Sequence, residues 1–195
     1  MCTKACRTRS PLRNNWEVAV SKPLDVLLIT PPSRVQVYQE LSRDFAAIEP
    51  PVWSGLIATF LRQHSCSVAI LDAEAEGLNH QQTAERIAAI APRLAVFVIY
   101  GQQPSASTQC MPAGRKVCEI LTTLADIPTL VMGTHPSALP KRTLLEEPYT
   151  YVCQGEGPAT ILGLVIALRA PQHSLREIPG LWHMEKGVPV GNAPA

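Results

Sequence analysis

Apolar residues along this chain form short unbroken runs that are separated by amphipathic stretches. The runs have strand length, and continuous apolar character is typical of strands that are covered on both faces. Each run is followed by a stretch whose apolar residues recur at helical spacing. In residues 52–64 the apolar side of the helix is expected to consist of Trp53, Leu56, Ile57, Phe60 and Leu61. We predict strands at 24–30, 67–72, 94–100, 127–133 and 149–155, and helices at 52–64, 80–92, 105–125, 136–147 and 157–170.

This alternation predicts an α/β fold, a flavodoxin-like (Rossmann-like) doubly wound five-stranded parallel sheet with helices on both faces. Right-handed crossovers and the common strand order 2-1-3-4-5 are expected. Residues 1–22 lack periodicity and are expected to form a flexible N-terminal arm, and residues 23–170 to form the domain. Residues 171–195 contain "LWHMEKGVPVG", which predicts a C-terminal β-hairpin that leaves the domain.

Composition narrows the range of functions. The net charge is +1, so no strong field indicates nucleic acid or an anionic membrane as a partner. No apolar run approaches the roughly 20 residues that a membrane-spanning helix needs. The basic N-terminus lacks the apolar segment of a secretory signal, so a cytoplasmic location is expected. The chain has 6 cysteines, which are expected to be free thiols, because Cys2 and Cys6 have no third ligand nearby.

Candidate chemistry lies in the loops that follow the strands. In the order 2-1-3-4-5, ligands bind at the carboxyl ends of the strands, where the order reverses between strands 1 and 3. The loops "TPPSRVQ", "YGQQPSAST", "GTHPSALP" and "CQGEGP" are rich in Gly, Pro, Ser, Thr and Gln, and carry few charges. They contain no Walker A or G-x-G-x-x-G sequence. This chemistry suits a large, amide-rich ligand better than a phosphorylated nucleotide.

Titratable residues in these loops leave alternatives open. His135 is the one imidazole at a strand end, and it could ligate a metal, act as a base or be a loop histidine that only forms hydrogen bonds. Glu156, between Gly155 and Gly157, could bind a ligand amide or cap the following helix. Asp72 is expected to cap the turn after strand 2. No nucleophile–base pair has a recognisable spacing, and no catalytic residue is predicted.

Several segments taken together resemble one known family. They are "LDVLLITPPS", "EPPVWSGLIATFLRQHSCSVAILDAE", "VMGTHPSALP", "YVCQGEGPAT" and "IPGLWHMEKGVPVGNAPA". Their order and spacing over about residues 24–194 resemble the N-terminal half of B12-binding radical SAM proteins. In that family, a flavodoxin-like cobalamin-binding domain precedes a radical SAM barrel. "GTHPSALP" is similar to the family's G-G-x-H loop, and "CQGEGPAT" to its G-E-G-E turn, with Pro158 in place of the second acid.

The resemblance implies a methyltransferase-type cobalamin module that works with a radical SAM domain, in the full enzyme or on another chain. The corrin would lie across the strand ends, with its tail between strands 1 and 3. The residues expected to bind cobalamin are Thr30, Pro31, Pro32, Tyr100, Gly101, Gln102, Gln103, Ser105, Ser107, Thr108, Gly133, Thr134, His135, Pro136, Gln154, Gly155, Glu156 and Gly157.

Two family motifs are absent. Without C-x3-C-x2-C, this chain is expected to hold no iron–sulfur cluster and to be non-catalytic alone. Without D-x-H-x-x-G, cobalamin would bind with its own base displaced and no histidine on cobalt.

Other interpretations remain. A related domain that no longer binds cobalamin could act as an interaction module, with Trp182 in the hairpin as its contact. The chain could also be a fragment or one half of a split enzyme. Flavin and receiver domains are disfavoured, because "TPPS" replaces the phosphate loop or acidic cluster that they need after strand 1.

Overall fold

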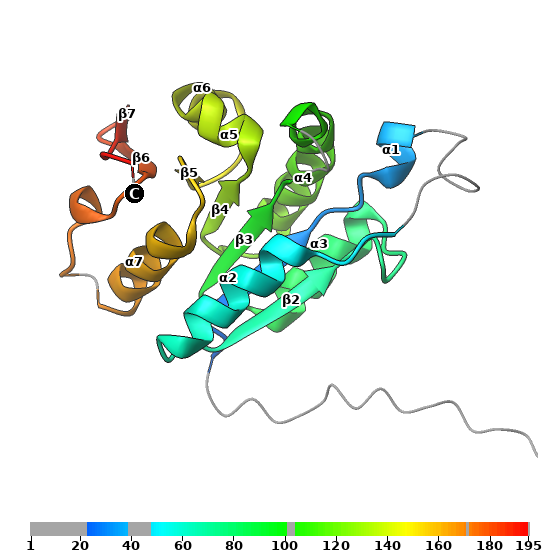
Figure 1. Cartoon of the computed structure of the whole chain (residues 1–195), viewed down its shortest axis with the longest axis horizontal. Coiled ribbons are helices and arrows are strands. Elements are labelled where there is room, and N and C mark those ends of the chain that lie inside the picture. Colours follow the sequence, from blue (N-terminus) through cyan, green and yellow to red (C-terminus); the bar gives the residue numbers. More distant parts are fainter. Residues whose placement is uncertain (1–22, 39–47, 101–103, 171, 195) are drawn as a thin grey trace, which may run out of the picture.

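One mixed sheet organises the molecule, as the computed structural model in Figure 1 shows. The structure describes residues 23–38, 48–100, 104–170 and 172–194. The strand order is β2-β1-β3-β4-β5-β6-β7, in which the first five strands are parallel and the last two antiparallel. The flavodoxin-like α/β fold with order 2-1-3-4-5 and a C-terminal hairpin is therefore confirmed. The strands are β1 Val26–Thr30, β2 Val68–Asp72, β3 Leu94–Val98, β4 Thr129–Met132, β5 Tyr151–Cys153, β6 Leu181–Glu185 and β7 Val188–Gly191.

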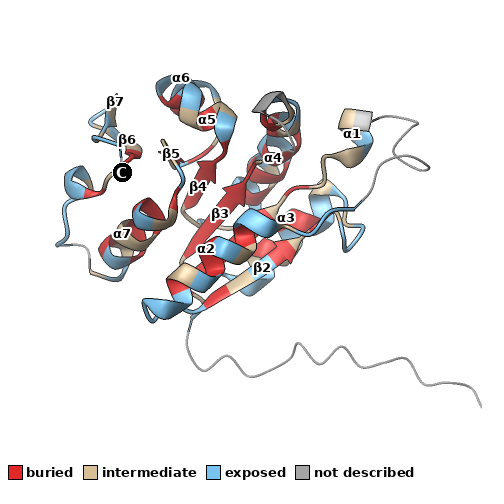
Figure 2. Cartoon of the chain, in the orientation of Figure 1, coloured by how far each residue is buried: buried red, intermediate tan, exposed pale blue. Residues whose placement is uncertain are grey.

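Helices cover both faces of the sheet (Figure 1). They are α1 Arg34–Tyr38, α2 Val52–Gln63, α3 His80–Ile90, α4 Pro104–Leu124, α5 Thr134–Ala138, α6 Pro140–Glu146 and α7 Pro158–Arg169, with a 3-10 turn at Leu175–Glu177. Val26 and Leu28 of β1 pack with α2 and α7, whereas Leu27 and Ile29 pack with α3 and α4. Both sides of the strand are therefore buried, which explains its unbroken apolar sequence. Figure 2 shows the same burial in β3 and β4. No helix in the described residues is long and apolar enough to span a membrane.

The register of the central strands aligns their carboxyl ends. β1 lies between β2 and β3, with Thr30 opposite Asp72 and Ile29 opposite Phe97. The connections leave β1 toward β2 on one side and reach β3 on the other, so this is the point where the strand order reverses. Crevices at such points are the usual ligand sites of open α/β sheets.

The side of helix α2 that faces the sheet differs from the side that the spacing of its apolar residues predicts. The buried residues are Ser54, Ile57, Ala58 and Leu61, at the i, i+3, i+4, i+7 spacing of one helix face. Trp53 is 42% exposed and Leu56 is 59% exposed, so these two residues of the predicted apolar side do not face the core. The small residues let the helix lie close to the strands, which turns the neighbouring large side chains outward.

The C-terminal hairpin is built into the sheet and does not leave the domain, contrary to the expectation from sequence. β6 pairs with β5, and β7 with β6, both antiparallel. Leu181 is fully buried, and the indole Nε1 of Trp182 donates a hydrogen bond to Gln154 Oε1 at 2.9 Å. Trp182 is thus half-buried against the core, not the exposed contact that the interaction-module interpretation assigned to it. The expected arm at 1–22 lies outside the described residues.

Two helical segments also differ from expectation. The stretch predicted as one helix at 136–147 is divided into α5 and α6 at Leu139. Leu139 precedes Pro140, and the proline ring disfavours helical geometry in the residue before it. Helix α1, directly after Ser33, was not predicted. Pro112 lies well inside α4, because this helix begins at Pro104.

Candidate functional site

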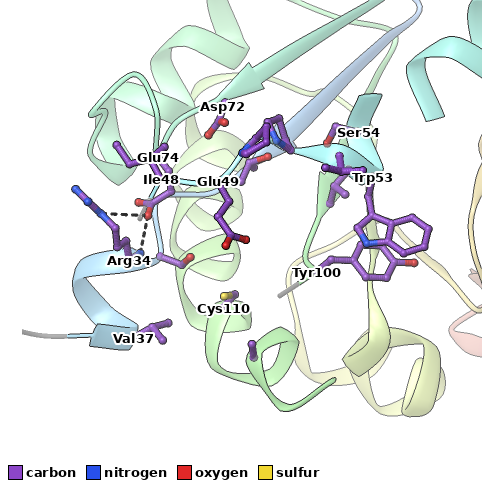
Figure 3. A pocket seen from close by; sticks show the side chains of 17 residues that line it. Arg34, Val37, Ile48, Glu49, Trp53, Ser54, Asp72, Glu74, Tyr100 and Cys110 are labelled. Atoms are coloured by element: carbon purple, nitrogen blue, oxygen red, sulfur yellow. Dashed lines mark hydrogen bonds and ion pairs between the residues drawn. The ribbon is translucent and has the colours of Figure 1, made fainter. Parts of the chain in front are cut away.

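A cavity of about 380 Å³ opens at the carboxyl ends of β1, β2 and β3. The last residue of each strand lines it, namely Thr30, Asp72 and Val98. The N-terminal turn of α2 and the first turns of α4 complete its walls (Figure 3). The cavity therefore lies at the switch point that the strand order predicts as a ligand site.

Carboxylates make the β2 side of this cavity rich in hydrogen-bond acceptors. Glu49, Asp72 and Glu74 all line it. Burial raises the pKa of Glu74, although the backbone N–H of Arg34 donates to Glu74 Oε2 at 2.9 Å and its guanidinium lies 3.9 Å away. Asp72 Oδ1 accepts a hydrogen bond from the backbone of Ala75 at 3.1 Å, so it caps the turn as expected. Such a wall suits a ligand that donates N–H groups and repels phosphate.

Ser54 places an unsatisfied hydroxyl beside the cavity. Its side chain is fully buried, and its Oγ has no hydrogen-bond partner among the described residues. Ser54 is among the residues that line the cavity. A buried hydroxyl without a partner costs about 1–3 kcal/mol, and in native structures it indicates a missing water, ion or ligand.

Two aromatic rings stand at the edge of the cavity. Trp53 of α2 and Tyr100, just beyond β3, stack with centroids 4.7 Å apart and planes at 20° (Figure 3). Burial raises the pKa of Tyr100 to about 12, with smaller contributions from Cys153 and Glu156 near the end of β5.

The hydroxyl of Ser107 in α4 connects the segments that follow β3 and β4. Ser107 is buried, and its Oγ donates to the Ile99 carbonyl at 2.6 Å and accepts from the His135 backbone N–H at 3.1 Å. Gly133 has φ +148°, and a Cβ there would overlap the Ile99 carbonyl oxygen. The backbone after β4 can approach β3 this closely only because residue 133 is glycine.

The ring of His135 is held by a neighbouring helix. Its Nδ1 lies 3.0 Å from Thr108 Oγ1. Burial lowers the pKa of His135, and the charge of Arg142 adds to this effect. A neutral ring with a hydrogen-bond partner corresponds to a histidine that only forms hydrogen bonds, one of the three roles that the sequence left open. Among the described residues, no three His, Cys, Asp or Glu side chains gather where they could hold a metal ion.

In the turn after β5, the side chain of Glu156 is exposed to solvent. Helix α7 is capped by the backbone of Gly157 with no side-chain hydrogen bond. A Cβ on Gly157 would lie 2.5 Å from Met132 Cε, while Gly155 has space around it and donates its N–H to Ser137 Oγ at 2.9 Å. The structure does not use Glu156 as a helix cap, which leaves its carboxylate accessible at the edge.

The candidate residues from sequence fall into three groups along this edge. Thr30 and Tyr100 line the cavity, with Pro31 and Pro32 directly after β1. The second group surrounds the start of α5, and the third is the turn after β5. Gly101, Gln102 and Gln103 lie outside the described residues, as does the side chain of Ser105.

Most of the cavity's lining was not among the binding residues predicted from the sequence. Examples are Arg34, Glu49, Trp53, Ser54, Glu74 and Cys110. The lining residues around the start of α2 could have been predicted from the sequence. The helix that follows the first strand begins near the carboxyl ends of the strands, so its first turn lies beside the switch point. Helical spacing had instead assigned Trp53 only to the apolar side of the helix.

These features define a domain of the open α/β class with a cavity at the carboxyl edge of its sheet. A family model for the B12 binding domain matches residues 41–165. The chain belongs to this family, which confirms the resemblance seen in the sequence. No curated protein matches the chain.

Solved structures show the same fold. The chain is similar to the radical S-adenosylmethionine methyltransferase TsrM from Kitasatospora setae, with tryptophan substrate and a SAM analogue bound. That match has 19% identity and a TM-score of 0.70, and covers 89% of this chain and 30% of TsrM. The cobalamin-dependent S-adenosylmethionine radical enzyme OxsB, with aqua-cobalamin and S-adenosylmethionine bound, matches at 16% identity and TM-score 0.66. This match covers 88% of this chain and 22% of OxsB. The chain thus spans less than a third of either enzyme.

Proposed function

We propose that this chain binds cobalamin at the carboxyl edge of its sheet. The observation that carries the proposal is the acceptor-lined cavity at the switch point, with the unpartnered hydroxyl of Ser54 in its wall. Cobalamin carries carboxamide side chains around its corrin ring, and these donate N–H hydrogen bonds. The cavity of about 380 Å³ has room for only part of such a ligand. The rest would lie across the strand ends.

The chain's residues would hold the ligand in three ways. Glu49, Asp72 and Glu74 accept hydrogen bonds from carboxamides at the β2 side. Gly133 and the glycines after β5 let the backbone approach the ring edge. Other polar groups of this edge contribute further hydrogen bonds, namely Thr30, Thr134, Gln154 and Glu156. Ser107 and Thr108 support this surface through their bonds to the β3 end and to His135.

We propose further that the ligand binds with its own base displaced from cobalt and no histidine in its place. Among the described residues that line the cavity, none is a histidine. His135 is bonded to Thr108, and the loop after β1 reads "TPPSR" with no imidazole.

The whole system would be a methyltransferase-type radical SAM enzyme. When bound, cobalamin supplies a cobalt centre that can carry a methyl group. This chain's part would be to bind and orient the cofactor, and a radical SAM domain, in the same protein or on another chain, would supply the cluster.

A visible absorption titration of the purified protein with hydroxocobalamin and methylcobalamin tests the proposal. We expect a base-off shift with Kd below about 100 µM, a free energy near −5.5 kcal/mol. No spectral change at that concentration would refute cobalamin binding by this chain.

Substitution of Ser54 sharpens the test. Ser54→Ala removes a hydroxyl that has no partner in the free protein, so we expect unchanged or slightly higher stability, by up to about 1 kcal/mol. Cobalamin affinity should nevertheless fall about fivefold, since one hydrogen bond contributes about 1 kcal/mol. Thr59→Val, on the exposed side of the same helix, is the matched control and should change neither value. Equal affinity of Ser54→Ala and the parent would remove Ser54 from the site.

One observation favours a second function, an interaction module. Large apolar side chains of α1 and α2 are exposed, with Val35 70%, Val52 61% and Leu56 59% exposed. Exposed apolar surface can mark a protein contact. This function would become the better proposal if the titration shows no binding.

A further inference from the structure

The C-terminal hairpin contacts the turn after β5 through the side chain of Trp182. Trp182 of β6 lies opposite Val152 of β5, and its indole Nε1 donates a hydrogen bond to Gln154 Oε1 at 2.9 Å. The backbone N–H of Gln154 donates to the Gly180 carbonyl at 2.8 Å. Gln154 directly follows β5, so the hairpin segment binds the first residue of this turn by both its backbone and its side chain.

The last strand of the sheet leaves room for the indole ring. Gly191 of β7 lies opposite Trp182, and a Cβ at this position would overlap the ring. A side chain at residue 191 would therefore displace the indole. Trp182 also packs against the core cluster that contains Val152 of β5. Contacts with both neighbouring strands thus fix the position from which its N–H group reaches Gln154.

The bond also fixes which end of the Gln154 amide faces the hairpin. An indole N–H can only donate a hydrogen bond, so the amide oxygen must face Trp182. The amide NH2 group remains, and no residue in the described part of the chain accepts a hydrogen bond from it. On the other side of the turn, the Gly155 N–H donates to Ser137 Oγ at 2.9 Å. The turn is therefore held on both sides, and it offers a fixed donor two residues before the exposed acceptor Glu156.

We propose that Trp182 is a positioning residue for cobalamin, which orients Gln154 so that its NH2 group donates to a carbonyl oxygen of a corrin carboxamide. This inference rests on the proposed function, since it concerns how the same edge binds the ligand. The acids of the cavity accept from the N–H groups of carboxamides, and Gln154 donates to the oxygen of another. The hairpin is then part of the support of the site. Coupling between sites is reciprocal, so the bound ligand also stabilises the hairpin.

Absorption titration with hydroxocobalamin, in the parent and three variants, tests the proposal. Trp182→Phe keeps a ring over Gly191 and removes the donor, so the Gln154 amide can rotate. We expect about fivefold weaker binding, the effect of one hydrogen bond. Gln154→Glu keeps an oxygen for the indole but has no N–H group, and should weaken binding at least as much. The double variant should bind no more weakly than Gln154→Glu, because Trp182 acts through Gln154.

A matched control separates positioning from loss of stability. Leu181→Val shortens a fully buried side chain next to Trp182 and leaves the bond between Trp182 and Gln154 in place. It should lower the urea midpoint of unfolding, while cobalamin affinity stays within about twofold of the parent. Parent-like affinity of Trp182→Phe, or single effects that multiply in the double variant, would overturn the positioning role and leave cobalamin binding intact. A parent that does not bind cobalamin would overturn both proposals.

Hydrogen exchange provides a second measurement, which does not depend on whether Trp182→Phe folds. Saturating hydroxocobalamin should slow exchange of the β6 amides several-fold in the parent, because opening of the hairpin breaks the bond to Gln154 and weakens the ligand's contact. In Gln154→Glu, which lacks this contact, the slowing should be smaller. Exchange of β6 that the ligand leaves unchanged in the parent would overturn the coupling.

Discussion

The buried carboxylate of Asp25 forms an ion pair at the edge of the sheet opposite the cavity. Replacing this carboxylate should destabilise the fold measurably. Asp25 directly precedes β1 and is 7% exposed. Arg169, the last residue of α7, donates to its two carboxylate oxygens at 3.0 and 2.7 Å. The backbone N–H and hydroxyl of Ser67, just before β2, donate at 2.9 and 2.7 Å. One carboxylate thus joins the start of β1, the start of β2 and the end of α7.

The contacts set the size of the expected effect. Asp25→Asn keeps the shape but turns a neutral amide toward Arg169, so two charge-assisted hydrogen bonds are lost or weakened. Each contributes about 1.5–3 kcal/mol, and one third of the Arg169 side chain is exposed, so water recovers part of this. We expect a loss of about 2–3 kcal/mol of unfolding free energy at pH 7, toward the lower end of what breaking a buried ion pair costs.

The pH dependence gives a second, independent signature. Burial alone would raise the pKa of Asp25, but hydrogen bonds from Arg169 and Ser67 outweigh it and hold the pKa well below its usual range. The stabilisation is therefore complete above the unfolded-state pKa near 3.9 and is lost as the pH falls toward the folded-state pKa. Below about pH 3.9, the gap between parent and Asp25→Asn should narrow by about 1.4 kcal/mol per pH unit.

Urea unfolding followed by circular dichroism at pH 7.0, 4.0 and 3.0 measures both signatures. Asp126→Asn, in the exposed loop before β4, serves as the matched control and should change stability by less than about 0.5 kcal/mol. The reasoning is refuted if Asp25→Asn behaves like this control at pH 7, or if its deficit stays the same between pH 7 and pH 3.

Four further outcomes test other parts of the structure. Gly133→Ala should unfold at lower temperature than Gly155→Ala, because both have positive φ but only the first meets a carbonyl oxygen; equal melting temperatures would contradict this. Burial lowers the pKa of His183, so stability should fall as the pH drops below about 6.5, and urea midpoints of His183→Asn should depend less steeply on pH than those of the parent. A chain that ends at Gly180 loses the fully buried Leu181 and uncovers β5, and should lose about 3 kcal/mol or more of stability; calorimetry showing an unchanged melting temperature would rule out a structural hairpin. Electron paramagnetic resonance of bound cob(II)alamin should show no splitting from an axial nitrogen, and such splitting would disprove the base-off proposal.

The strands could be predicted well because their chemistry is local. β1 and β3 are covered on both faces, so nearly every residue is apolar, and the runs at 24–30 and 94–100 need no tertiary information to be recognised. The position of the hairpin could not be predicted in this way. Its two strands have the same local pattern whether they extend the sheet or leave it, and the difference depends on the exposed edge of β5, which is remote in sequence.

The position of the cavity could be predicted from the sequence, but most of its lining could not. Strand order predicts a ligand site at the carboxyl ends, and two of the predicted residues, Thr30 and Tyr100, line the cavity found there. Which side of α2 faces the sheet depends on how close Ser54 and Ala58 let the helix approach, and this packing decides that Trp53 stands at the cavity. The spacing of hydrophobic residues predicts which side of a helix is apolar. It does not predict which part of that side is buried against the sheet.

The placement of acids along the edge is the strongest argument about ligand chemistry. A phosphate-binding turn excludes carboxylates, because the helix N-terminus and its N–H groups must face the anion. Here Glu156 stands exposed between two glycines at the start of α7, and Asp72 and Glu74 line the cavity after β2. A nucleotide whose phosphates lay along this edge would meet negative charge at both ends. A ligand that presents amide N–H groups around a flat ring would meet acceptors instead, and this is the arrangement that a corrin with carboxamide side chains requires.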